Sequence, residues 1–318
     1  MGERVAPGQR VAFLGPAGTF TEEALRSESD LAAARLLPER SFAQVLAAVD
    51  DGRADYGFVA LENAIEGSVV ATLDQLVFER DLLIIREVLL PVTQHLLAAP
   101  GTALGDIEAV VSFPVATAQC RAWLAAHLPD VDERAATSTS EAVRYVATER
   151  PAGTAAIGTA LAGELYGLEV LASGIEDHDH NVTRFALVAP AAAGVPAPSG
   201  HDKTTVVCFQ AADRPGSLHG ILGQFSARDI NLVKLESRPT KRALGEYCFI
   251  VDFEGHVADE VVADCLRDLH VTLREVKFLG SYPAAGEPGE TRRRDAHQAW
   301  AAADAWIDAI RRCVHDPA

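Results

Sequence analysis

The residues best suited to chemistry lie together in the pentapeptide 181–185, NVTRF. The acids and histidines of 176–180 precede it, and the apolar run 185–189 predicts that it opens a β-strand. The Thr183 hydroxyl can donate or accept a proton, and the Arg184 guanidinium can bind a carboxylate through two N–H groups. Loop-to-strand junctions often present reactive groups. The same residues would also suit an ordinary strand start with a surface arginine.

Two predicted strand ends in the first half of the chain carry further polar residues. An apolar strand at 10–14 is followed by a glycine-rich turn and by Thr19, which caps a helix; this arrangement suits an anion. A second strand, at 55–61, leads into Glu62 and Asn63. Ligands of open α/β sheets bind at such carboxyl ends. The turn fits no nucleotide-binding pattern, and a plain strand-to-helix connection remains the alternative.

Composition limits the partners and the compartment. The 318 residues are 48% hydrophobic and 23% charged, as in an ordinary globular protein of about two domains. The net charge of −17 argues against nucleic acid or an anionic membrane as partner, and an anionic ligand would need local cations or helix N-termini. No apolar run is long enough to span a membrane, and no apolar secretion core precedes Val11. The five cysteines form no CxxC pair, so we expect free thiols in the cytoplasm.

Hydrophobic patterns predict two types of domain. Strands and helices alternate up to about residue 189, which predicts a largely parallel α/β sheet, and the alternation restarts near Leu90, which indicates two lobes with a cleft. The uncharged, Ala/Pro-rich stretch 190–200 is a linker. Beyond it the order becomes βαββαβ, a ferredoxin-like module. A further helix is expected at about 296–312.

Five motifs occur in the order of one known family. They are Gly15-Pro16-Ala17-Gly18-Thr19-Phe20, Glu62-Asn63 with Glu66-Gly67, Asn181 with Thr183-Arg184-Phe185, Gly216-Ser217-Leu218, and Glu236-Ser237-Arg238-Pro239. From about Val11 to Tyr282 the chain resembles monofunctional prephenate dehydratase with a C-terminal ACT domain. The resemblance implies an α/β, two-lobed, periplasmic-binding-protein-like (type II) catalytic domain and an α+β ACT regulatory domain.

The resemblance also implies domain limits. They are 10–189 for the catalytic domain (lobe 1 about 10–89 and 176–189, lobe 2 about 90–175), 190–202 for the linker, 203–283 for the ACT domain and 284–318 for a tail with a helix.

The implied reaction is the loss of carbon dioxide and of the ring hydroxyl from prephenate, which gives phenylpyruvate for L-phenylalanine biosynthesis. Thr183 would polarise the leaving hydroxyl, Asn63 would bind substrate oxygens and Glu62 would order the loop. The expected substrate-binding residues are Thr19, Ala64, Ser112, Phe113, Ser138, Thr159, Arg184 and Phe185. Because side chains alternate across a strand, Arg184 is equally suited to a structural role. No cofactor is expected.

The ACT domain implies feedback inhibition by L-phenylalanine bound between two subunits. The residues expected at this site are Asp213, Pro215, Gly216, Ser217, Leu218, Glu236, Ser237, Arg238 and Pro239. Gly216 would let the backbone approach the ligand closely. A site shared between subunits implies a homodimer or a homotetramer.

Two departures from the family pattern leave alternatives open. Ala64 stands where the family has serine, and Phe113 stands where it has histidine. A non-aromatising prephenate decarboxylase would tolerate such changes, although the intact pentapeptide favours the dehydratase. A non-catalytic ligand sensor with an ACT module is a further alternative. The Asp/His run 177–180 suggests a metal, but alternate residues of an extended segment point apart and no second ligand cluster is evident, so no metal is expected.

Overall fold

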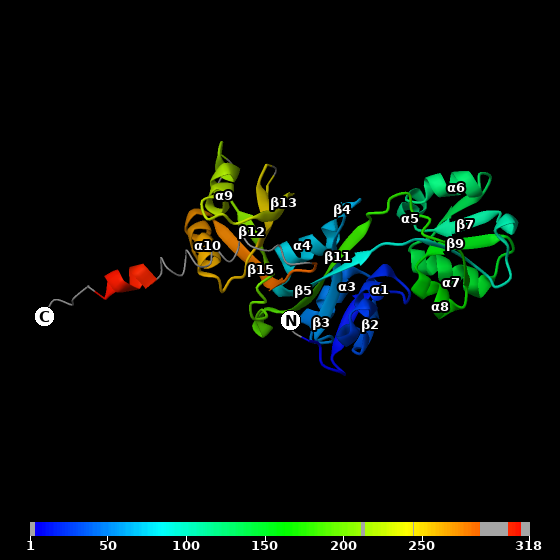
Figure 1. Cartoon of the computed structure of the whole chain (residues 1–318), viewed down its shortest axis with the longest axis horizontal. Helices are drawn as coiled ribbons and strands as arrows, with labels where there is room; N and C mark the ends of the chain where they lie inside the picture. Colours follow the sequence, from blue (N-terminus) through cyan, green and yellow to red (C-terminus); the bar gives the residue numbers. More distant parts are fainter. Residues whose placement is uncertain (1–3, 211–213, 244, 287–304, 313–318) are drawn as a thin grey trace. The chain divides into compact units, whose positions relative to one another are not determined.

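The computed structural model describes residues 4–210, 214–243, 245–286 and 305–312 (Figure 1). Two compact units make up this chain. One comprises residues 4–82 and 87–193, and the other comprises residues 83–86 together with the chain from 194 onward. No helix of the described ranges is long and apolar enough to cross a membrane.

The first lobe is built on a six-stranded sheet with the order β2-β1-β3-β11-β5, with β4 paired to β3. Its strands are β1 (Arg10–Leu14), β2 (Arg35–Glu39), β3 (Tyr56–Asn63), β4 (Gly67–Ser68), β5 (Leu82–Pro91) and β11 (Val182–Pro190). Its helices are α1 (Phe20–Ser27), α2 (Ser29–Ala32), α3 (Phe42–Asp50), α4 (Val70–Asp74) and the π-helical turn η1 (Gln75–Glu79). The first six residues of β3 are all buried, as expected for a central strand covered on both faces.

The second lobe is built on a five-stranded sheet with the order β10-β6-β9-β7-β8. The strands are β6 (His95–Ala98), β7 (Ala109–Ser112), β8 (Asp132–Ala135), β9 (Thr154–Gly158) and β10 (Glu169–Ser173). The helices are α5 (Pro114–Ala118), α6 (Arg121–His127), α7 (Thr139–Glu149), α8 (Ala160–Tyr166) and the short η2 (Leu104–Asp106). Apolar clusters cover both faces of this sheet, one around Leu96 and Ile157 and the other around Leu97 and Val143.

Both sheets are mixed, so the prediction of a largely parallel sheet is wrong. Strand β11 runs antiparallel to β3, and β6 runs antiparallel to β9 and β10. The physical reason is the path of the chain. Strand β11 completes the first sheet only after the chain has built the second lobe, and it enters from the opposite direction to β3.

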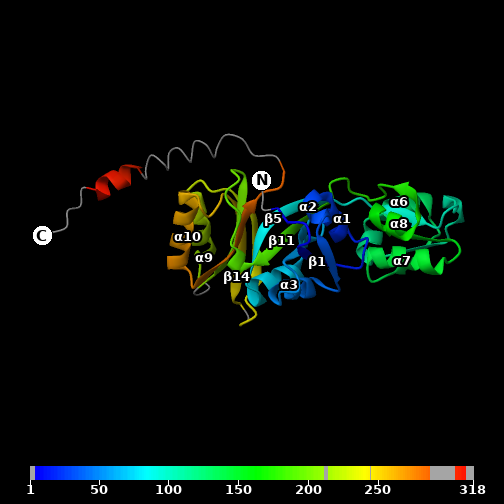
Figure 2. The same ribbon diagram turned by 90° about the horizontal axis from the view of Figure 1, so that it is seen from below.

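The C-terminal unit confirms the predicted βαββαβ order. Its elements are β12 (Asp202–Phe209), α9 (Ser217–Ser226), β13 (Leu232–Pro239), β14 (Tyr247–Glu254), α10 (Glu260–Thr272) and β15 (Glu275–Pro283). The sheet has the order β13-β14-β12-β15, and each pair of neighbouring strands is antiparallel. Helices α9 and α10 lie on one face of it (Figure 2), around a core that includes Phe225 and Phe253. The short η3 (Ala191–Ala193) precedes this unit, and the tail is helical at 305–311.

Candidate active site

The centre of the site is a hydrogen bond between two neighbouring strands. Thr183 on β11 lies opposite Asn63 at the end of β3, and the Asn63 Nδ2 donates to Thr183 Oγ1 at 2.9 Å and to Asn181 Oδ1 at 2.6 Å. The Asn63 Oδ1 accepts from the backbone N–H groups of Ile65 and Glu66, each at 3.0 Å. These four bonds fix the direction of the amide. Thr183 therefore serves as an acceptor toward Asn63 and keeps its own hydroxyl proton for another acceptor.

The second lobe extends this network. Asn181 is only 2% exposed, and its Nδ2 donates to Gln119 Oε1 at 3.2 Å. The Gln119 Nε2 in turn donates to Glu66 Oε1 at 3.3 Å. Gln119 is the residue that ends α5, so the chain of hydrogen bonds from Thr183 joins the two lobes. Sequence reasoning missed Gln119 as a site residue, although a lone amide directly after the apolar stretch 114–118 was an available signal.

Arg184 lies between two carboxylates. Its Nε is 2.6 Å from Glu87 Oε2, and its Nη1 is 3.0 Å from Glu62 Oε1. The residue is 6% exposed. Because successive side chains of a strand point to opposite faces, Arg184 and Thr183 serve different sides of the sheet. Arg184 and Glu62, expected to bind substrate and to assist catalysis, contact each other here, and their predicted roles stay predictions.

The hydroxyl groups expected to bind carboxylates make hydrogen bonds within the catalytic scaffold. Thr19, Ser138 and Thr159 cap α1, α7 and α8, each accepting from the backbone N–H three residues later. Thr19 also donates to Leu14 O at 2.9 Å, and the fully buried Ser112 donates to Ile157 O at 2.8 Å. These hydroxyls therefore stabilise the scaffold, and carboxylate binding by this group remains a prediction.

The glycine-rich turn of the first lobe packs directly on the second lobe. Thr159 Oγ1 donates to Gly18 O at 2.8 Å, Tyr166 OH donates to Ala17 O at 3.2 Å, and Ser140 Oγ also donates to Ala17 O. Gly18 has a φ of +85°, and a Cβ atom there would lie 2.8 Å from the Ala162 Cβ. Only glycine fits both the backbone angle and this close approach.

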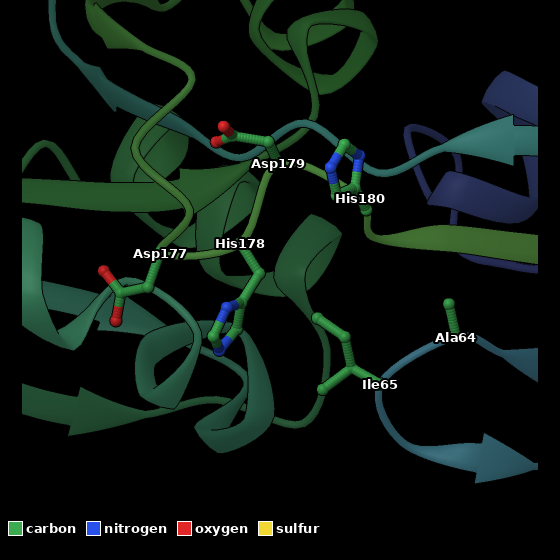
Figure 3. A pocket seen from close by; sticks show the side chains of 6 residues that line it. All are labelled: Ala64, Ile65, Asp177, His178, Asp179 and His180. Atoms are coloured by element: carbon green, nitrogen blue, oxygen red, sulfur yellow. The ribbon is translucent and has the colours of Figure 1, made fainter.

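An open pocket of about 520 Å³ adjoins the end of β3 (Figure 3). It is lined by Ala64, Ile65, Asp177, His178, Asp179 and His180. Ala64 follows Asn63 directly, and its N–H donates to Val182 O at 2.8 Å, so the pocket begins next to the Asn63–Thr183 pair. Asp177 points away from Ala64 and Ile65 and accepts from the backbone N–H groups of Ala122 and Trp123.

The two predicted phenylalanines differ in exposure. Phe113, which precedes α5, is 42% exposed, whereas Phe185 is buried and stacks on Phe58 with ring centroids 5.3 Å apart.

Among the residues that the structure describes, no three His, Cys, Asp or Glu side chains form a group that could hold a metal ion. Burial, and next the nearby Asp177 and Glu176, raise the pKa of the Cys120 thiol to about 12. Cys120 is therefore a neutral thiol and a poor nucleophile at neutral pH.

In the C-terminal unit, the predicted ligand residues lie at a helix start and on an edge strand. Gly216 has a φ of +87° and precedes α9, and the Ser217 Oγ donates to Arg214 O at 2.8 Å. The segment 236–239 ends β13, the edge strand of its sheet, and its residues are alternately half-buried and exposed. Asp213 lies outside the described residues.

Comparison with known proteins decides the family. A family model for prephenate dehydratase matches residues 11–193, and a model for the ACT domain matches residues 204–271. The chain belongs to the prephenate dehydratase family. The prephenate dehydratase of Mycobacterium tuberculosis H37Rv is 42% identical over 288 residues, which cover 88% of each chain. That of Mycolicibacterium vanbaalenii is 42% identical over 299 residues, covering 88% of this chain and 92% of that protein.

Solved structures of family members confirm the predicted fold class. Prephenate dehydratase of Arthrobacter aurescens in complex with L-Phe superposes with a TM-score of 0.86 at 42% identity and covers 95% of this chain and 99% of that one. Prephenate dehydratase of Staphylococcus aureus gives a TM-score of 0.74 at 28% identity, over 86% of this chain and all of that one. GqqA, described as a novel type of quorum quenching acylase, gives 0.79 at 32% identity, over 87% and 98% of the two chains.

Proposed function

We propose that this chain is a prephenate dehydratase, a hydro-lyase that converts prephenate to phenylpyruvate, carbon dioxide and water in L-phenylalanine biosynthesis. The observation that carries the proposal is the Thr183 hydroxyl held at 2.9 Å from Asn63 in a chain that is 42% identical to prephenate dehydratases. In this reaction the bond to the ring carboxylate breaks, its electron pair enters the ring, and the ring hydroxyl leaves as water. Aromatisation drives these steps, so the protein must mainly orient the substrate and polarise the leaving oxygen.

We propose different tasks for the residues around Thr183. Thr183 donates a hydrogen bond to the departing oxygen, and the proton that completes the water molecule comes from solvent. Asn63 holds the Thr183 oxygen so that the hydroxyl proton is directed elsewhere. Glu62 acts indirectly through its ion pair with Arg184. Carboxylate binding by Thr19, Ser112, Ser138 and Thr159, and ring contacts by Ala64 and Phe113, belong to the proposal as well.

Incubation of the purified protein with prephenate tests the reaction. We expect phenylpyruvate, detected by its ultraviolet absorbance in alkali, and a fall in kcat of about 10²- to 10⁴-fold for Thr183→Ala. Thr183→Ser, which keeps the hydroxyl, is the matched control and should keep much of the rate. A non-aromatic dihydro product would establish the decarboxylase instead. Ligand binding without turnover, unchanged in Thr183→Ala, would establish the sensor.

Cys120 and Ser112 are poorly suited to an acylase reaction. Acyl transfer through a covalent intermediate needs an activated nucleophile beside a base. Cys120 is buried with a pKa raised to about 12, and the Ser112 hydroxyl donates to a backbone carbonyl. The similarity to GqqA therefore supports a shared fold.

We further propose that L-phenylalanine inhibits the enzyme by binding between the ACT domains of two subunits in a homodimer or homotetramer. The L-Phe complex of the Arthrobacter aurescens relative supports the ligand, and the positive φ of Gly216 suits close backbone approach. Calorimetry and steady-state kinetics with L-phenylalanine test the inhibition, and light scattering measures the subunit number. The absence of both binding heat and inhibition at saturating L-phenylalanine would refute this proposal. A cytoplasmic location and the domain limits 10–189, 190–202, 203–283 and 284–318 complete the proposal.

A further inference from the structure

Glu87 on β5 is almost fully buried and ion-pairs with Arg184, the residue that follows Thr183. We propose that Glu87 is a positioning residue of the active site, which acts through Arg184 to hold Thr183 at its place on β11. This inference rests on the proposed dehydratase function. It gives Glu87 a role through Arg184 and not through contact with the substrate.

The sheet explains why one ion pair can fix β11. Strand β11 lies between β3 and β5, and Arg184 reaches a carboxylate on each of them. The bond to Glu87 is the shorter of the two, 2.6 Å against 3.0 Å. The Glu87 side chain is 1% exposed, whereas that of Glu62 is 31% exposed. Because screening by water is weakest for buried charges, Glu87 is the stronger anchor of the two.

The backbone ladder between β11 and β3 is irregular next to Arg184. The register with β3 pairs Thr183 with Asn63 and Arg184 with Glu62, and then shifts between Arg184 and Phe185. Such an irregularity breaks the regular hydrogen-bond pattern directly after the two functional residues. Side-chain anchoring of Arg184 therefore compensates where the ladder is interrupted. Since neighbouring residues of a strand face opposite sides, fixing Arg184 on one face also fixes the Thr183 hydroxyl on the other.

Removal of the Glu87 charge has a definite geometric consequence. The guanidinium would keep its pair with Glu62 on β3 and would lose the attraction of the Glu87 carboxylate on β5. The adjoining Thr183 would then lose its set distance of 2.9 Å to Asn63. Misplacement of a reacting group by about 1 Å can cost about 10²-fold in rate.

The experiment compares Glu87→Gln and Glu87→Asp with a matched ion-pair variant, Asp55→Asn. Asp55 pairs with Arg10 at 2.8 Å in the same lobe. It directly precedes the first residue of β3, whereas Asn63 is the last residue of that strand. We expect Glu87→Gln to lower kcat by about 10- to 100-fold while KM changes less than about threefold, because a displaced Thr183 hydroxyl acts on the transition state. Glu87→Asp, which keeps the charge on a shorter side chain, should retain an intermediate kcat. Asp55→Asn should keep the wild-type kcat.

Rates are measured on folded protein, well below the unfolding midpoint of each variant, so that a loss of kcat reports geometry. A Glu87→Gln or Glu87→Asp enzyme with wild-type kcat would overturn the inference, as would an equal loss in Asp55→Asn. If Glu87→Gln does not fold, Glu87→Asp alone decides by the same criterion. Absence of phenylpyruvate with the wild-type protein would instead overturn the proposed function, and this inference with it.

Discussion

Asn63 donates its side-chain N–H to the Thr183 hydroxyl at 2.9 Å across the β3–β11 pair. The amide cannot turn over freely, because its oxygen accepts two backbone N–H groups of the following turn, those of Ile65 and Glu66. Asn63 thereby decides which way the Thr183 proton points. A neighbouring N–H group can only donate to the Thr183 oxygen. It therefore leaves the Thr183 proton available for the departing oxygen.

Replacement of Asn63 by aspartate tests this directionality. A carboxylate oxygen in place of Nδ2 would accept from Thr183 and divert the proton that the leaving oxygen needs. It would also add a negative charge beside an anionic substrate. We expect kcat/KM to fall by about 10²-fold or more in Asn63→Asp, measured by phenylpyruvate formation.

The exposed Asn231, in the C-terminal unit, supplies the control for this change of charge. Asn231→Asp makes the same substitution far along the chain from the catalytic residues and should keep the wild-type kcat/KM. Equal activity of the Asn63→Asp enzyme and the wild type would contradict the assigned direction of the hydrogen bond.

The sequence allowed the strand ends of the site to be predicted, but not the contacts between them. Asn63 follows the largely apolar run 55–61, at the carboxyl end of a strand where α/β folds place their ligands, and Thr183 precedes the apolar run 185–189 at the start of another strand. Glu87 could not be identified, since it lies inside β5, and only the sheet order brings β5 next to β11. Gln119 was missed for the same reason: its bond partner Asn181 is 62 residues away.

Strands β2 and β8 are among those missed, and their composition explains why. Strand β2 contains Pro38 and is at most half-buried, and β8 is exposed throughout. Both are at the edge of a sheet, where burial imposes no apolar pattern on the sequence. The central strand β3 is buried along its first six residues, and it was predicted at 55–61.

His95 at the start of β6 should make stability depend on pH. Burial lowers the pKa of His95, and the nearby Glu176 opposes this shift only in part. The folded state therefore binds the proton less readily than the unfolded state, so the stability from His95 is fully present above its unfolded pKa and is lost as the pH falls through the folded pKa. We expect the urea concentration at the unfolding midpoint to decrease as the pH is lowered from 7.5 to 5. The decrease should be smaller in His95→Asn. An identical pH dependence in both proteins would contradict this origin.

The buried thiols should be unreactive in the native protein. Burial is the first cause that raises the pKa of Cys120, Cys208 and Cys265 to about 12 in each case. At pH 8 the reactive thiolate is then a very small fraction, and the thiols are shielded as well. We expect iodoacetamide to leave these three residues unmodified in the native state and to alkylate them in urea, as read by peptide mass spectrometry. Rapid alkylation of Cys120 in the native protein would contradict this expectation and would show a reactive thiol.

Gly18 and Gly101 provide a matched pair for testing the packing between the lobes. Their φ angles are nearly equal, +85° and +83°, but a Cβ atom at Gly18 would lie 2.8 Å from Ala162 Cβ, whereas at Gly101 it would meet no atom within 4 Å. Alanine at Gly101 therefore adds backbone strain alone, which we expect to cost about 1 kcal/mol of unfolding free energy. Alanine at Gly18 adds the clash and should cost about 1–3 kcal/mol more. The Gly18→Ala change should also lower kcat, because the turn before Thr19 can no longer pack closely against α8. Urea denaturation and prephenate turnover measure both effects, and equal losses in the two variants would show that the contact with α8 contributes nothing.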